Sequence, residues 1–192
     1  KRERATSNIC TASALMASMT GFYCVYNGPE GLRRAAETAH LAAATVARAL
    51  EAMDYRLASK EFFDTLEVEA EAAVVQSLAL EQGINFYYPS EGRVRMSFDE
   101  VTTAAEIETV VSIFAAAKGK KAKAVKAVTE SCVPTALRRQ SPYLQEPVFN
   151  AYRSESALMR YIKKLELRDI SLANSMISLA VSYTHLTLPT IR

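Results

Sequence analysis

The sequence has few of the residues from which metal sites and disulfide frameworks are built. Its 192 residues include three cysteines, with no C-x-x-C pair, and two histidines, His40 and His185. These are too few and too scattered for a tetrahedral metal site. An odd number of cysteines favours a reducing compartment over secretion. We therefore expect no bound metal, and a chain of this length needs no disulfide to be stable.

An excess of charge of one sign is also lacking. Lys and Arg together number 23 and Asp and Glu number 21, so the net charge is +2. This balance favours neither nucleic acid nor a membrane surface as a partner. The sequence also contains no glycine-rich phosphate loop, no H-E-x-x-H and no G-x-S-x-G motif. Apolar residues make up 49% and charged residues 23%, which is typical of a globular protein.

No charged residue lies between Arg4 and Glu30, a length at which a membrane span has to be considered. Seven hydroxyl and amide side chains between positions 6 and 20 argue against a span, because each would need a hydrogen-bond partner in lipid. We expect a helix that is apolar on most sides and buried against another layer or subunit. Thr6 or Ser7 is expected to cap this helix, and Asn27-Gly28 to end it.

The following residues, up to 117, predict an α+β domain with helices packed on a short, mainly antiparallel sheet. The expected elements are a helix over 29–50, a strand over 62–68, a helix over 70–82, a hairpin of strands 84–88 and 93–98 around a turn at 89–92, and a helix after a capping box at Thr103 and Glu106. The alanine-rich face of the 29–50 helix favours a tight hairpin with the preceding helix.

The composition changes after this domain, which spans residues 1–117. Five lysines between 118 and 126, followed by three prolines, indicate a connector over 118–153. Lysines so closely spaced could contact a polyanion, but no aromatic residue is interleaved, so a solvated connector is the better interpretation. Ser154 then caps a helix, and residues 154–179 form the final segment.

Three groups of residues could bind or react, and each has a simpler structural explanation. His40 could act as an acid or base, but a packed or interface histidine is the better interpretation. Arg93 and Arg95, with the tyrosines at 87 and 88, could hold an anion, although a polar outer strand face accounts for them. Cys10 and Cys24 are fourteen positions apart, which fits buried thiols on one helix face.

Six segments in order carry a more specific signal. They read R-E-R-A-T-S-N-I-C-T-A at 2–12, Y-N-G-P-E-G-L at 26–32, F-F-D-T-L at 62–66, P-V-F-N at 147–150, L-M-R-Y at 158–161 and S-M-I at 175–177. This series resembles the P-protein family of the glycine cleavage system, the glycine dehydrogenases (decarboxylating). Arg4 and Arg153 depart from the family pattern, which has Lys and often His there. The resemblance covers residues 1 to 179.

The resemblance implies a fold-type I enzyme that uses pyridoxal 5'-phosphate to decarboxylate glycine and passes the aminomethyl group to the lipoyl group of the H-protein. The chain corresponds to the small C-terminal domain of the family's N-terminal half and the segment that joins the halves. The cofactor lysine belongs to a His-Lys motif in the C-terminal half, and this sequence contains no His-Lys dipeptide. We therefore expect no catalytic, cofactor-binding or metal-binding residue here, and a structural, interface role.

Three residues are expected to lie nearest the cleft between the halves: Thr6, Ser7 and Asn8. A capped helix N-terminus presents free amides to an anion. The alternative is that they only cap the helix. The implied partners are the C-terminal catalytic half or subunit, lipoylated H-protein and glycine, in the cytoplasm of a bacterium or in a mitochondrion if the source is eukaryotic.

Two features indicate a fragment. The chain starts at Lys1 without an initiating Met, and residues 180–192 resemble translated adaptor sequence, so we exclude this probable non-native tail, with His185, from the fold. The alternative to a piece of an enzyme is a non-catalytic α+β interaction module.

Overall fold

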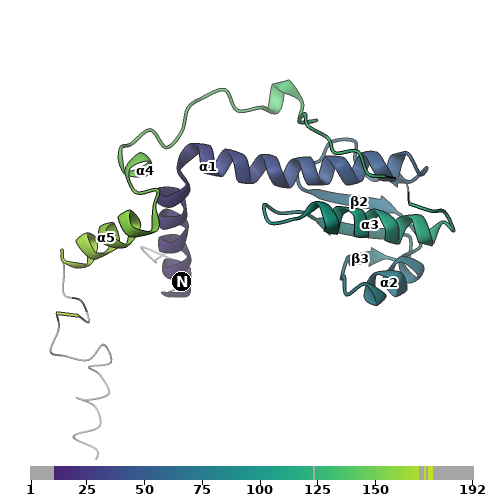
Figure 1. Ribbon diagram of the computed structural model, residues 1–192, viewed down its shortest axis with the longest axis horizontal. Coiled ribbons are helices and arrows are strands. Elements are labelled where there is room, and N and C mark those ends of the chain that lie inside the picture. Colours follow the sequence, from purple (N-terminus) through teal and green to yellow (C-terminus); the bar gives the residue numbers. More distant parts are fainter. Residues whose placement is uncertain (1–10, 123, 169–170, 172, 175–192) are drawn as a thin grey trace, which may run out of the picture. The chain divides into compact units, whose positions relative to one another are not determined.

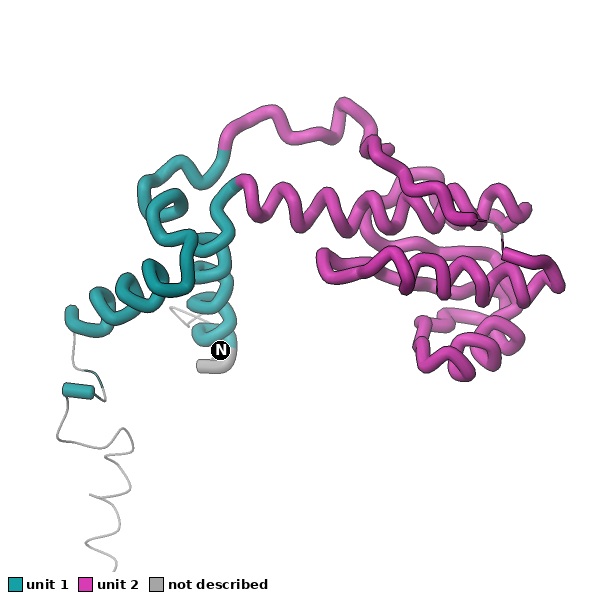
Figure 2. The backbone as a smooth tube through the Cα atoms, viewed as in Figure 1, with its two compact units in different colours: residues 1–29, 143–192 teal, residues 30–142 magenta. Residues whose placement is uncertain are grey.

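The computed structural model describes residues 11–122, 124–168, 171 and 173–174. They fall into two compact units, one formed by residues 1–29 with 143–192 and the other by residues 30–142 (Figure 2). No helix in the described part of the chain is long and apolar enough to cross a membrane.

The 30–142 unit is built on a four-stranded antiparallel sheet in the order β1-β2-β4-β3 (Figure 1). Its strands are β1 (Arg56–Leu57), β2 (Thr65–Glu69), β3 (Tyr87–Ser90) and β4 (Arg93–Ser97). The helices of this unit are α2 (Ala72–Glu81), α3 (Ala104–Ala117) and the second part of α1 (Thr11–Glu51), and a short 3-10 turn spans Thr135–Leu137. The expected α+β class, with an antiparallel sheet, is confirmed.

Alternation along the central strands places one face of the sheet in the core. Leu66 and Val68 of β2 lie opposite Met96 and Val94 of β4, and all four side chains are buried. They pack against buried residues of three helices, which include Val46, Leu50, Val75, Ala79, Val111 and Phe114. The helices therefore cover the apolar face of the sheet, and the polar face remains open.

The 29–50 segment packs differently from the prediction. The structure joins it to the preceding segment in one long helix, α1, with a kink at Gly28, whose φ of 62° and ψ of −177° are not helical. The prediction assigns the alanines of this segment to contact with the preceding helix. Ala42, Ala43 and Ala47 are buried in the core of the 30–142 unit, because their small side chains let α1 approach the layer of sheet and α3 side chains there.

Most of the other predicted elements are present, with bounds that differ by a few residues. Thr103 and Glu106 form the predicted capping box at the start of α3. The 84–88/93–98 hairpin is present as β3 and β4, although Pro89 and Ser90 belong to β3 rather than to the turn. The strand expected from residue 62 begins at Thr65.

The other unit contains the first part of α1 together with α4 (Val148–Ala151) and α5 (Glu155–Glu166). The Ser154 hydroxyl accepts a hydrogen bond from the Ala157 N–H, which confirms the predicted cap of α5. The rings of Tyr152 and Tyr161 stack with centroids 4.2 Å apart. The Tyr143 hydroxyl donates to the Pro29 carbonyl over 2.7 Å and so ties the segment before α4 to the kink of α1.

Candidate functional site

The residues predicted to lie nearest a cleft, Thr6, Ser7 and Asn8, lie outside the described residues, and so does Cys10. Their predicted roles stay predictions. The described residues offer four places to examine: the first part of α1, a pocket beside β4, the polar face of the sheet, and the surroundings of His40.

The first part of α1 carries a row of large, exposed apolar side chains. Leu15, Met16, Met19, Tyr23 and Tyr26 are exposed to 63%, 60%, 55%, 45% and 41%. Positions 15, 19, 23 and 26 are spaced by three or four residues, so they lie along one face of the helix. An apolar row of this size on a stretch of helix without charge is typical of an interaction surface. The lack of charge between Arg4 and Glu30 is the sequence signal that indicated it.

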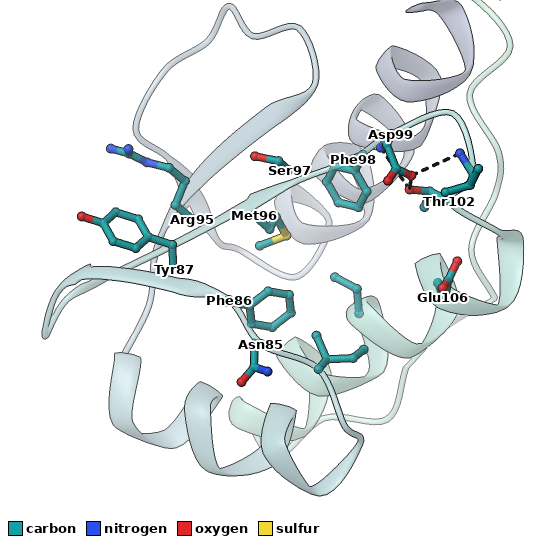
Figure 3. A pocket seen from close by; sticks show the side chains of 13 residues that line it. Asn85, Phe86, Tyr87, Arg95, Met96, Ser97, Phe98, Asp99, Thr102 and Glu106 are labelled. Carbon is teal, nitrogen blue, oxygen red and sulfur yellow. Dashed lines mark hydrogen bonds between the residues drawn. The ribbon is translucent and has the colours of Figure 1, made fainter. Parts of the chain in front are cut away.

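A pocket of about 380 Å³ lies where β4 runs toward α3 (Figure 3). Phe86, Met96 and Phe98 give it an apolar wall, to which Val110 of α3 contributes. Asp99 and Thr102 lie in the loop that leads to α3, and Arg95 lies at the opposite end beside Tyr87 (Figure 3). This pocket could not be predicted from the sequence, because it forms where residues 84–86 leave the paired part of the hairpin.

The charged groups of this pocket are engaged in local structure. The Asp99 carboxylate accepts hydrogen bonds from the Val101 N–H and the Thr102 hydroxyl, at 3.2 and 2.8 Å. The Glu106 carboxylate accepts from the Thr103 N–H and hydroxyl, and these bonds, above all the one from the backbone, lower the pKa of Glu106. Both carboxylates therefore serve as acceptors that fix the start of α3.

The polar face of the sheet places Glu67 of β2 between two arginines of β4. The Arg95 Nε lies 2.8 Å from Glu67 Oε2, and Arg93 also binds this carboxylate. Hydrogen bonds from Arg93 and Arg95 lower the pKa of Glu67. The Arg95 guanidinium also lies over the Tyr87 ring, 5.4 Å from its centroid. The two arginines considered as an anion site thus support the sheet itself.

Replacing Glu67 with Gln is expected to make the free energy of unfolding depend less on pH at acidic pH. A carboxyl whose pKa is lowered by folding adds stability above its ordinary pKa of 4.5, and this stability is lost as the pH falls through the lowered value. The free energy of unfolding of wild type should therefore exceed that of Glu67→Gln at about pH 7, and the difference should shrink as the pH falls below 4.5. Urea unfolding at several pH values measures this. Glu108→Gln, on the exposed side of α3, is the control, and a pH-independent gap between wild type and Glu67→Gln would contradict the prediction.

Two lysines of the run over 118–126 bind groups at the C-terminal end of α1. The Lys118 ammonium donates to the carbonyls of Met53 and Asp54, at 2.9 and 2.7 Å, and lies 4.0 Å from the centroid of the Tyr55 ring. Lys120 pairs with the Asp54 carboxylate at 3.2 Å. A cation at the carbonyl end of a helix is favourable, so these two lysines have a structural role.

His40 is a packed histidine, only 2% exposed. Its ring stacks on Phe63, with centroids 5.3 Å apart, and both ring nitrogens have partners far away in the sequence, at Phe63 and Cys132. The sequence predicted that His40 is packed, but it did not indicate the partners of its ring nitrogens. Across the described ranges, no three His, Cys, Asp or Glu side chains are grouped so as to hold a metal ion.

The chain is similar in sequence to one family of known proteins. A family profile described as "Glycine cleavage system P-protein" matches residues 1–114. The glycine dehydrogenase (decarboxylating) of Flavobacterium johnsoniae is 47% identical over 180 residues, and that of Bacteroides thetaiotaomicron is 44% identical over 184 residues. Both alignments cover 93% of this chain but 19% of the relative, so the chain spans about one fifth of the length of these proteins.

A solved structure is also similar. The crystal structure of glycine decarboxylase (P-protein) of the glycine cleavage system, in inhibitor-bound form, matches with a TM-score of 0.50 and 25% sequence identity. The match covers 60% of this chain and 29% of that one. Sequence and fold therefore point to the same family.

Proposed function

The chain belongs to the family of glycine cleavage system P-proteins, and we propose that it is a supporting segment of a glycine dehydrogenase (decarboxylating). In this proposal the whole protein decarboxylates glycine with pyridoxal phosphate and passes the aminomethyl group to lipoylated H-protein. The segment forms the small domain of the N-terminal half, over residues 1–117, the connector over 118–153 and the 154–179 stretch leading to the C-terminal half. The matched relatives come from bacteria, and we place the protein in the bacterial cytoplasm.

The pocket beside β4 does not fit pyridoxal phosphate. The pocket beside β4 contains no lysine, and its carboxylates are occupied by backbone and hydroxyl donors. Lys118 and Lys120 are bound to the end of α1, and Lys163 pairs with Glu166 at 2.7 Å. In this proposal the rest of the protein binds the cofactor, and no chemical step is assigned to this segment.

The apolar row on α1 is the observation that carries the supporting role. Five large side chains that are 41–63% exposed here are costly to leave in water, and a chain that spans 19% of its relatives leaves most of the protein to cover them. We propose that the C-terminal half, or a catalytic subunit, packs on this row. A buried interface of this kind is apolar at its centre and depleted of charge, as the first part of α1 is.

A chimera tests the proposal. The corresponding segment of the Flavobacterium johnsoniae enzyme is replaced by residues 1–179 of this chain, and glycine decarboxylation is assayed with lipoylated H-protein. We expect activity within about tenfold of the unmodified enzyme, since the two segments are 47% identical. A folded chimera without activity would overturn the proposal and favour the non-catalytic interaction module.

Carboxylates placed on the apolar row test its burial. In the chimera, Leu15→Asp combined with Met19→Asp should lower activity by at least about tenfold, because an unpaired carboxylate in an apolar interface is strongly unfavourable. Val101→Asp is the matched control, since Val101 is an apolar residue that is 73% exposed in the other unit. Full activity and stability of the double variant would show that the row stays in water.

The cleft position of Thr6, Ser7 and Asn8 is a further part of the proposal. If Asn8 faces the cleft, Asn8→Ala in the chimera should raise the KM for glycine or lower kcat, with little change in the melting temperature. A role limited to capping would instead lower the melting temperature and leave the kinetics unchanged.

A further inference from the structure

Cys132 and His40 form a pair that the supporting role does not require. The buried imidazole of His40, on α1, lies 3.3 Å from the Sγ of Cys132, and the two residues are 92 positions apart in the sequence. Cys132 itself is exposed and carries a free thiol. A nucleophilic side chain at the surface therefore contacts a base held in the protein interior.

The hydrogen bonds of His40 identify which nitrogen carries the proton. The backbone N–H of Cys132 donates to Nε2 over 3.0 Å, and a backbone N–H can only donate, so Nε2 carries no proton. Nδ1 lies 2.8 Å from the carbonyl oxygen of Phe63, to which it donates. The ring is therefore neutral, and stacking on Phe63 holds its plane. The lone pair of Nε2 points to Cys132, and the thiol S–H shares this lone pair with the backbone N–H.

The arrangement has the three parts of an activated nucleophile. The thiol is the nucleophile, Nε2 is the base, and the Phe63 carbonyl orients the base through Nδ1. Beside the thiol lies a cavity of about 370 Å³, large enough for a small molecule. The charged side chains that line it are two cations and two anions: Arg48, Glu51, Lys60 and Glu130. The formal charges of these four side chains cancel.

We propose that Cys132 is a thiol-modification site that reacts with small aliphatic disulfides, with His40 as the proton acceptor. The thiol proton moves to Nε2, and the thiolate attacks one sulfur of the disulfide. A bond forms between Sγ and that sulfur as the original S–S bond breaks. The departing thiolate takes the proton from Nε2, so a mixed disulfide and one free small thiol result, and no further oxidant is needed.

The backbone around Cys132 can stay in place during this reaction. Protonation of Nε2 costs the hydrogen bond from the Cys132 N–H, but other bonds hold the same segment. The Val128 N–H donates to the Thr45 hydroxyl over 3.0 Å, and the Arg138 guanidinium donates to the carbonyls of Ser131 and Val133. The nucleophile is thus presented to His40 by a segment that is anchored on both sides of Cys132.

The test uses the full chain with Cys10→Ser and Cys24→Ser, which leaves Cys132 as the only thiol. Oxidised glutathione is added at about pH 6, where an ordinary thiol is almost wholly protonated, and mixed-disulfide formation is followed by intact mass spectrometry. The folded chain should react at least about tenfold faster than the same chain unfolded in urea, since only the folded chain places His40 beside the thiol. An equal or slower rate in the folded chain would overturn the proposal.

The pH profile and a His40 variant separate proton transfer from simple exposure. The rate of an unassisted thiol falls about tenfold for each pH unit below its pKa, whereas the folded chain should show a weaker dependence between about pH 8 and pH 6. His40→Asn should restore the steep dependence, and Thr38→Asn, on the exposed side of the same helix, should not. A profile in folded wild type as steep as that in urea would contradict the role of His40, whether or not His40→Asn folds.

Discussion

Phe114→Ala is expected to lower the free energy of unfolding of the 30–142 unit by about 3–5 kcal/mol. Phe114 lies on α3 and is fully buried in the core. The Tyr55 ring meets it edge-on, with centroids 5.3 Å apart at 89°, and the Phe86 ring lies 5.9 Å away. Truncation therefore removes two ring contacts and leaves a cavity that the rigid layers on either side cannot close.

Urea unfolding followed by circular dichroism measures this loss. Val101→Ala is the control, because Val101 is 73% exposed and its truncation should change the free energy by less than about 0.5 kcal/mol. A loss below about 1 kcal/mol for Phe114→Ala would show that the core adapts to the missing ring and is packed more loosely than the structure indicates.

Elements whose causes are local could be predicted from the sequence. The capping box needs only Thr103 and Glu106, three residues apart, and Ser154 caps α5 through the nearby Ala157 N–H. The alternation along β4 likewise shows its buried face without reference to any other strand. In each case the residues that determine the structure lie within a few positions of one another in the sequence.

Elements whose causes are distant could not be predicted. The contact partners of His40 are 23 and 92 positions away, and no local pattern links them. The alanines of α1 indicated close packing but not its partner, which is the core of the 30–142 unit rather than a preceding helix. The pocket beside β4 also depends on where two paired strands diverge. Small side chains and single histidines fit many neighbours, so tertiary packing decides among them.

The family could be predicted because its motifs occur in order along the chain. A functional site could not be predicted from the chemistry of the side chains. The sequence contains no His-Lys dipeptide, and Glu106 and Lys120 are engaged in a helix cap and an ion pair. Two exposed features have no such role in a cap or an ion pair: the apolar face of the first part of α1 and the thiol of Cys132. Both are features whose use depends on a partner, which explains why residue chemistry alone indicates only an α+β module.

Gly28→Ala is expected to destabilise the unit that contains the kink of α1 by about 2–4 kcal/mol. With φ at 62° and ψ at −177°, Gly28 occupies a backbone region that is essentially restricted to glycine. A Cβ added there would also lie 2.5 Å from a guanidinium nitrogen of Arg153 and 2.7 Å from the Phe149 carbonyl oxygen. The substitution therefore combines backbone strain with a steric conflict against Phe149 of α4 and against Arg153.

Hydrogen exchange of the amides in α1, α4 and α5 measures the effect in this unit. Gly21→Ala is the matched control, because Gly21 lies within the helical part of α1 with no heavy atom within 4 Å of an added Cβ, and alanine should stabilise the helix by about 0.5–1 kcal/mol. Combining Gly28→Ala with Arg153→Ala separates the two causes. Removal of the guanidinium relieves one contact, while the Phe149 carbonyl and the positive φ remain, so most of the loss should persist. Full recovery in the double variant would place the whole cost in the side-chain contact and would show that the kink accepts a residue other than glycine.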